Sequence, residues 1–206
     1  MSVNAVMEAL PGLAWTTDPA LVRQKSRDFF WYSPVLKRQL NKVTGEALVT
    51  PRNEAELRAL LATAYAHGVP VTPRGAGTGN YGQAMPLRGG IVLEMTEFNR
   101  VLWAKPGVVR AEAGVKLIDL DAHLKTAVGG ELRFHPSTKR TATLGGFIAG
   151  GSSGIGIANP HVLSIEEGSG YRRVPGDQLG FKRMADPLGL LNPGKMRDFT
   201  IEDAAA

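Results

Sequence analysis

The pattern of apolar and polar positions predicts a domain that mixes helices with short strands. The clearest helix covers residues 53–68, where Asn53 can cap the first turn, Glu56 completes a capping-box pair and Gly68 ends the helix. One face of this helix carries its apolar side chains, Leu57, Leu60, Leu61 and Ala64. A second helix is expected over residues 116–127, where leucines recur at helical spacing.

Short apolar runs are typical of strands and occur at residues 46–50, 69–73, 89–95, 107–115 and 161–167. A helix and an aromatic-rich segment are expected before the first run, and we expect Trp31 and Tyr32 to pack in the core rather than line a ligand site. Residues 136–156 are expected to form a glycine-rich loop, and residues 168–181 a turn or linker. The order of elements favours an α+β fold over regular βαβ winding.

Composition narrows the function classes. The net charge of +5 is scattered among acidic residues, so no nucleic-acid partner is expected. The chain has no cysteine, which excludes thiolate chemistry, and its four histidines show no ligand spacing, so no metal site is expected. No apolar run approaches a membrane span and no signal peptide is evident, so we expect a soluble, cytoplasmic protein.

The first glycine cluster contains Gly77-Thr78-Gly79-Asn80-Tyr81-Gly82, which matches the G-x-G-x-x-G dinucleotide pattern. A dinucleotide-binding turn requires a helix to begin at the loop, yet here the chain runs on through Pro86 into another strand. We therefore interpret the loop as a nest in which successive backbone N–H groups turn inward towards an anion such as a pyrophosphate. A long flexible hairpin loop is the alternative.

Two glycine-rich segments and the C-terminal tail together resemble the FAD-binding domain of the vanillyl-alcohol oxidase / para-cresol methylhydroxylase (PCMH-type) family, which includes glycolate oxidases and D-2-hydroxy-acid dehydrogenases. The matching stretches are PVTPRGAGTGNYGQAMP, HPSTKRTATLGGFIAGGSSGIG and DPLGLLNPGK. The resemblance implies a PCMH-type fold of two α/β subdomains with FAD between them. It also implies an FAD-binding domain at residues 46–160, after an N-terminal helical segment at 1–45.

The resemblance also implies which residues contact FAD. In the first loop they are Pro73, Arg74, Gly75, Ala76, Gly77, Thr78, Gly79, Asn80 and Gln83. In the second segment they are Pro136, Ser137, Thr143, Leu144, Gly145, Gly146, Ala149, Gly150, Gly151, Ser152, Gly154, Ile155 and Gly156. In the tail they are Asn192 and Lys195. Family members with covalent flavin often carry a histidine where this chain has Thr78, so we expect non-covalent FAD.

The chain departs from the family in one respect. Family members carry a substrate-binding cap domain between the second segment and the C-terminal signature, whereas here only about 20 residues, 157–176, occupy that place. We expect residues 161–176 to be a connector and residues 177–206 to return to the FAD domain. A natural minimal form, an engineered or spliced deletion and a decayed gene product all fit this departure.

Two functions follow as expectations. The first is the FAD-binding module of an FAD-linked oxidoreductase of the 2-hydroxy-acid type, with reduced substrate specificity and no assigned catalytic residue. The second is a flavin-free interaction or scaffold subunit that retains the fold. The substrate and electron acceptor are not identified, and a homodimer or a partner subunit fits either function.

Overall fold

The computed structural model describes residues 2–151 and 176–191. The chain divides into two compact units. The first comprises Met1–Arg74, Gly79–Glu94 and Arg172–Ala206, and the second comprises Gly75–Thr78 and Met95–Tyr171. Within the described residues, no helix is both long enough and apolar enough to cross a membrane. The strand expected at residues 161–167 lies outside them.

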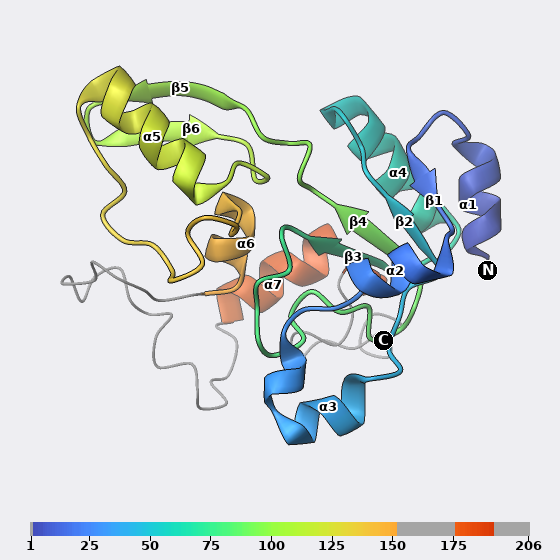
Figure 1. The fold of residues 1–206 in the computed structure, drawn as a ribbon. Helices are drawn as coiled ribbons and strands as arrows, with labels where there is room; N and C mark the ends of the chain where they lie inside the picture. The colour runs from blue at the N-terminus through green and yellow to red at the C-terminus, as the bar shows by residue number, and fades with distance from the viewer. Residues whose placement is uncertain (1, 152–175, 192–206) are drawn as a thin grey trace. The chain divides into compact units, whose positions relative to one another are not determined.

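The first unit is built on a four-stranded sheet with the order β1-β2-β4-β3 (Figure 1). Strands β2 (Ala47–Val49), β3 (Val71–Arg74) and β4 (Ile91–Glu94) are parallel, and the two-residue β1 (Trp15–Thr16) runs antiparallel to β2. Every residue of β2 and β4 is buried, as expected for parallel strands, which are usually covered on both faces. Three of the predicted strands are confirmed, whereas β1 is an addition.

Helix α4 (Glu54–Ala66) confirms the clearest helix of the sequence pattern. The side-chain oxygen of Asn53 accepts the N–H of Glu56 at 2.9 Å and so caps the first turn. Leu60 is fully buried on the apolar face. Gly68 ends the helix region with a φ of 63°, a left-handed conformation that glycine adopts without strain.

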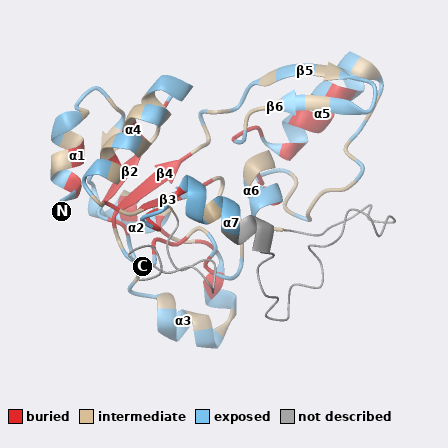
Figure 2. Cartoon of the chain, turned by 180° about the vertical axis from the view of Figure 1, so that it is seen from behind, coloured by how far each residue is buried: buried red, intermediate tan, exposed pale blue. Residues whose placement is uncertain are grey.

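The chain before β2 forms more helices than the one we expected. They are α1 (Val3–Ala9), α2 (Pro19–Lys25), the 3-10 helix η1 (Phe30–Tyr32) and α3 (Pro34–Leu40). Helix α2 places Val22 in a buried cluster with Leu48 and Val92 of the sheet, whereas α3 buries none of its residues (Figure 2).

The expectation that Trp31 and Tyr32 pack in the core is wrong. Their exposed fractions are 44% and 66%, and their rings contact each other, with centroids 4.2 Å apart. The adjacent Phe30 is fully buried and takes the core position instead. Because the short η1 turns only one of its three aromatic side chains inward, the other two stay at the surface.

The second unit pairs an antiparallel hairpin with a helix. Its strands are β5 (Val101–Lys105) and β6 (Val108–Ala111), and its long helix is α5 (Leu117–Val128). Leu120 and Leu124 of α5 form a buried cluster with Val115, against which hairpin residues pack. Strand β6 and helix α5 confirm the pattern, but β5 was not predicted.

Helix α6 (Leu144–Ala149) replaces part of the loop that we expected over residues 136–156. The hydroxyl of Thr143 accepts a backbone N–H of its first turn at 3.3 Å. The N–H of Gly145 donates to the carbonyl oxygen of Ala113 at 2.7 Å, and a Cβ on Gly145 would lie 3.0 Å from that oxygen. Glycine usually disfavours a helix, but here close packing requires it. The loop expectation is therefore wrong for residues 144–149.

Helix α7 (Gly176–Ala185) overlaps the end of the stretch that we expected to be a turn or linker, residues 168–181. The linker expectation is wrong for residues 176–181. Gly176 and Gly180 concealed the helix, because glycine is a poor helix former.

The segment after α7 returns to the sheet of the first unit. The buried carboxylate of Asp186 accepts the N–H groups of Leu190 and Leu191 at 2.9 and 3.0 Å. The carbonyl oxygen of Leu190 in turn accepts the N–H of Val71 at 2.9 Å, and Leu191 forms a parallel bridge with Val71 of β3. The expected return of residues 177–206 to the FAD domain stays a prediction.

Candidate functional site

The first glycine-rich loop, residues 75–90, connects two adjacent parallel strands without a helix. It leaves β3 at its carboxyl end and leads into the start of β4. Gly77 and Gly82 have φ angles of 70° and 77°, which bend the backbone in a way that other residues resist. The connection from strand to loop to strand agrees with our rejection of the dinucleotide turn.

The loop presents a run of unsatisfied backbone donors. The N–H groups of residues 76–80 donate no hydrogen bond to any residue that the structure describes. Residues 76–79 are half-buried and Asn80 is exposed. Half-buried backbone donors normally find a partner, and successive N–H groups that turn inward can form an anion-binding concavity. We call residues 76–80 the N–H cradle.

Arg74, the last residue of β3 before the loop, binds backbone carbonyls of the N-terminal segment. It is buried and donates to the carbonyl oxygens of Lys25 and Arg27, the latter at 3.1 Å. Burial lowers the pKa of Arg74, while the neighbouring Glu94 and Asp28 carboxylates act in the opposite direction. The side chain therefore fastens the loop to the end of α2, and its predicted contact with FAD stays a prediction.

Other predicted residues of the first loop support its shape. Gln83 accepts the N–H of Tyr81 at 3.0 Å, and a Cβ on Gly79 would lie 2.6 Å from the same side-chain oxygen. A side chain at position 79 would therefore displace the Gln83 amide. Pro73 is exposed on β3, the edge strand, where a residue without an N–H is tolerated.

The two glycine-rich segments meet at one point inside the second unit. A Cβ on Gly75 would lie 2.0 Å from the hydroxyl oxygen of Thr143, a separation that real atoms do not reach. The predicted residues of both segments are thus brought together at these two positions. Thr143 is buried, and its hydroxyl is already used to cap α6. Its predicted bond to FAD stays a prediction.

The remaining predicted residues of the second segment are either held by protein groups or exposed. The N–H of Leu144 donates to the carbonyl oxygen of Val115 at 2.8 Å, so the start of α6 is held by protein groups. Pro136 is half-buried and its carbonyl oxygen accepts the N–H of Lys139, which forms a turn. The exposed positions, where a flat ligand could lie against backbone, are Ser137, Gly146, Ala149 and Gly150, with Gly151 half-buried.

Six predicted contact residues lie outside the described residues: Ser152, Gly154, Ile155, Gly156, Asn192 and Lys195. Their contacts with FAD stay predictions.

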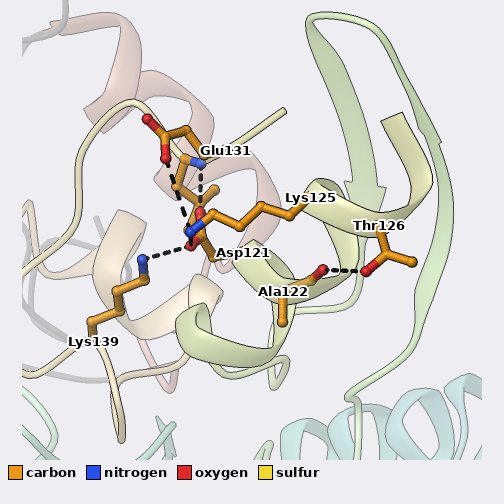
Figure 3. Close-up of polar contacts among 7 residues, drawn as sticks. Asp121, Ala122, Lys125, Thr126, Glu131 and Lys139 are labelled. Atoms are coloured by element: carbon orange, nitrogen blue, oxygen red, sulfur yellow. Dashed lines mark hydrogen bonds and ion pairs between the residues drawn. The ribbon is translucent and has the colours of Figure 1, made fainter. Parts of the chain in front are cut away.

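The sequence pattern missed a buried carboxylate that fixes the second segment. Asp121 of α5 accepts the N–H of Leu132 at 2.8 Å and pairs with Lys139 at 2.8 Å and Lys125 at 3.0 Å (Figure 3). Lys125 also lies 4.0 Å from Glu131. The network ties residues 131–139, and with them the turn at Pro136, to α5. A charged residue on the apolar face of a predicted helix was the available signal.

The same segment closes the start of α5. The N–H groups of Leu117 and Ile118 donate to the carbonyl oxygens of Ala142 and Lys139 at 3.0 and 3.1 Å. The residue before the helix, Lys116, makes no side-chain cap, so these carbonyls satisfy donors that a cap would otherwise meet. Helix and segment therefore stabilise each other.

A family model described as "FAD binding domain" matches residues 45–165. The chain belongs to the FAD-binding domain family. FAD is the cofactor of this family, which confirms the resemblance seen in the two glycine-rich segments.

Curated relatives of this FAD-binding domain are FAD-linked or hydroxy-acid enzymes. Glycolate oxidase subunit GlcD of Bacillus subtilis is 31% identical over 129 residues, which cover 59% of this chain and 27% of the relative. D-2-hydroxyglutarate dehydrogenase of Escherichia coli is 39% identical over 132 residues, 58% of this chain and 13% of the relative. D-lactate dehydrogenase of Archaeoglobus fulgidus is 39% identical over 129 residues, which cover 58% of this chain and 28% of the relative. The chain thus matches less than a third of the length of these relatives.

Solved structures confirm the fold of the FAD-binding domain. Alkyldihydroxyacetonephosphate synthase aligns with a TM-score of 0.62 at 23% identity, over 74% of this chain and 32% of that one. The Physcomitrella patens BBE-like 1 protein aligns with a TM-score of 0.55 at 17% identity, over 71% of this chain and 30% of that one. The expected mixture of helices and sheets in a PCMH-type FAD-binding fold is correct.

The Asp121 network should make the stability of the FAD-binding domain depend on pH. Burial would raise the pKa of Asp121, but hydrogen bonds from Lys139, the Leu132 N–H and Lys125 outweigh it and hold the pKa well below its usual value of 3.8. Because the folded pKa is depressed, this contribution is complete above that value and is lost as the pH falls towards the folded pKa.

Asp121→Asn should lower the free energy of unfolding at pH 7 by about 2–3 kcal/mol, because two lysines lose a buried partner. It should also reduce the loss of stability below about pH 4. Urea unfolding followed by circular dichroism at several pH values measures both effects. Asp119→Asn, an exposed carboxylate on the same helix, should change stability by less than about 0.5 kcal/mol. Equal effects of the two substitutions would contradict the assignment.

Proposed function

We propose that the chain is the FAD-binding module of an FAD-linked oxidoreductase that acts on a 2-hydroxy acid. Support comes from the relatives, whose names specify glycolate, D-2-hydroxyglutarate and D-lactate, all of which carry a hydroxyl beside a carboxylate. Their shared chemistry defines the substrate class, and no single member of the class is favoured. We keep a cytoplasmic location as part of the proposal.

The N–H cradle is the observation that carries the proposal. A pyrophosphate offers several negatively charged oxygens close together, and successive N–H groups of residues 76–80 can meet them without a charged side chain. The absence of described protein acceptors for these donors agrees with an anionic ligand taking that place. The cradle therefore fits the diphosphate part of FAD.

The chain contributes binding and orientation to the reaction. When bound, FAD would supply the hydride-accepting chemistry for oxidation of a hydroxyl-bearing carbon. Residues 76–80 would hold the diphosphate, and the exposed backbone around Gly146 and Gly150 would let the rest of the cofactor lie close. Gly75 and Thr143 would keep the two glycine-rich segments in contact while this happens.

A glycine substitution in the cradle tests this assignment. Gly77→Val should abolish measurable FAD binding in a fluorescence titration, because valine opposes the φ of 70° and distorts the cradle. Gly107→Val is the matched control, since Gly107 has a similar φ of 81° in the β5–β6 turn, with open space around it. The control should cost a similar amount of stability and retain FAD. Loss of binding in both variants, or in neither, would contradict the proposal.

We propose that FAD is bound without a covalent bond. The chain has Thr78 where covalently flavinylated family members often carry a histidine, and it has no cysteine. After acid precipitation of the FAD complex, the yellow colour should stay in the supernatant. Flavin absorbance that remains with the washed precipitate would overturn this proposal.

We further propose that the bound flavin is open to solvent and shows little substrate selectivity, because only residues 157–176 separate the second segment from the C-terminal signature. Chemically reduced FAD complex should be reoxidised by oxygen and by artificial acceptors of different shapes at similar rates. Stopped-flow absorbance measures the rates. A reduced complex that is inert towards every acceptor would refute an open flavin.

A homodimer or a complex with a partner protein is also part of the proposal. Support comes from the glycolate oxidase relative, whose name describes it as one subunit of that enzyme. Light scattering of the purified chain at several concentrations tests the homodimer, and a strictly monomeric mass would exclude it.

A further inference from the structure

Asp28 lies buried between α2 and η1 and holds two backbone donors from different parts of the chain. One carboxylate oxygen accepts the N–H of Phe30 at 2.9 Å, and the other accepts the N–H of Gly82 at 2.8 Å. Gly82 belongs to the first glycine-rich loop, more than fifty positions along the sequence. Asp28 therefore connects the N-terminal segment directly to that loop.

A second bond joins the same two segments. The N–H of Phe29 donates to the carbonyl oxygen of Gly79 at 2.8 Å. A Cβ on Gly79 would lie 3.3 Å from the nearer carboxylate oxygen of Asp28, so the loop backbone passes close to this side chain. Gly79 is part of the N–H cradle, and its carbonyl is thus fixed while its N–H has no described partner.

The other end of the loop is fastened to the same N-terminal segment. Arg74, the residue immediately before the loop, donates to the carbonyl oxygens of Lys25 and Arg27. The Arg74 charge also faces the carboxylates of Asp28 and Glu94, so the buried carboxylate of Asp28 has a cation near it. Residues 25–30 consequently hold the loop on both sides of the cradle, before the cradle at Arg74 and at its far end by Asp28.

We propose that Asp28 is a positioning residue that sets the N–H cradle in its FAD-binding shape before FAD arrives. This inference rests on the proposed FAD function. A loop without helix or strand would otherwise lose conformational freedom on binding, and a loop that is ordered in advance binds more tightly. Asp28 does not itself touch FAD in this proposal, because both of its oxygens are occupied by backbone donors.

Asp28→Asn is the direct test. An amide offers only one oxygen, so its NH2 group must face either the Phe30 or the Gly82 N–H and release it. We expect FAD affinity to fall about tenfold to a hundredfold, as the loss of a hydrogen bond to a buried charge suggests. Asp18→Asn is the matched control, since Asp18 also accepts backbone N–H groups, those of Ala20 and Leu21, but does not reach the loop. It should leave FAD affinity within about twofold of wild type.

Hydrogen exchange in the absence of FAD gives a readout that does not require the cofactor. The Phe29 amide reports whether the Gly79 carbonyl is in place, although Asp28 makes no bond to that amide. In Asp28→Asn the amides of Phe29 and Gly82 should exchange at least about tenfold faster, while the amides of α4 keep their protection. A purely structural role would accelerate exchange across the whole first unit instead.

A second variant keeps the inference testable if Asp28→Asn fails to fold. Phe29→Pro removes the N–H that holds Gly79 and leaves the carboxylate in place, and the φ of −87° at this position is about 20° from the usual value for proline. It should also weaken FAD binding about tenfold.

The outcomes separate the two ideas. If wild-type protein does not bind FAD, the proposed function fails, and the exchange experiment still decides whether Asp28 orders the loop. If wild type binds FAD and folded Asp28→Asn has the same affinity and the same Phe29 protection, the inference about Asp28 is overturned. Weaker binding together with local loss of protection supports it.

Discussion

The structure depends on an unusual connection between two adjacent parallel strands. Parallel neighbours are normally joined by a helix, which satisfies the N–H groups of the crossing chain internally. Between β3 and β4 the chain crosses as a loop, residues 75–90, and so cannot use its donors in that way. The backbone groups of this crossing must be met by other parts of the protein or by a ligand. The N–H cradle is one run of donors in this crossing that the described residues do not meet.

Buried carboxylates hold the irregular segments on which the site is built. Asp28 holds the first loop, Asp121 holds the turn before α6, and Asp186 holds the segment that joins β3. Each accepts backbone N–H groups and has a cation near it. Arg74 lies near Asp28, Lys125 and Lys139 pair with Asp121, and Lys182 pairs with Asp186. A carboxylate can accept several donors at once, which suits a chain without regular hydrogen bonding. Bonds between buried carboxylates and backbone N–H groups therefore help to shape these loops.

The sequence predicted those parts of the fold whose signals are local. The cap at Asn53, the glycine at Gly68 and the apolar run of β4 depend on neighbours in sequence, and all three appear in the structure. Helix α6 could not be predicted, because Gly145 is tolerated only through its contact with Ala113, thirty-two positions earlier. The surface position of Tyr32 was equally hidden, since aromatic side chains give no sign of which face they occupy.

In the candidate site, too, local signals were predictable from the sequence and contacts between distant residues were not. Glycine clustering identified both segments, because glycine marks places where backbone approaches something closely. It did not reveal what each glycine approaches: Gly75 faces Thr143, Gly79 faces Gln83 and Asp28, and Gly145 faces Ala113, so these three make room for protein. Gly77 instead bends the chain within the cradle. A glycine-rich ligand loop thus contains glycines of two kinds, those that let the loop pack against its supports and those that turn its N–H groups towards the ligand. Gly75 and Gly145 matter as much as Gly77, because a cradle without a fixed backbone has no defined shape to offer a diphosphate.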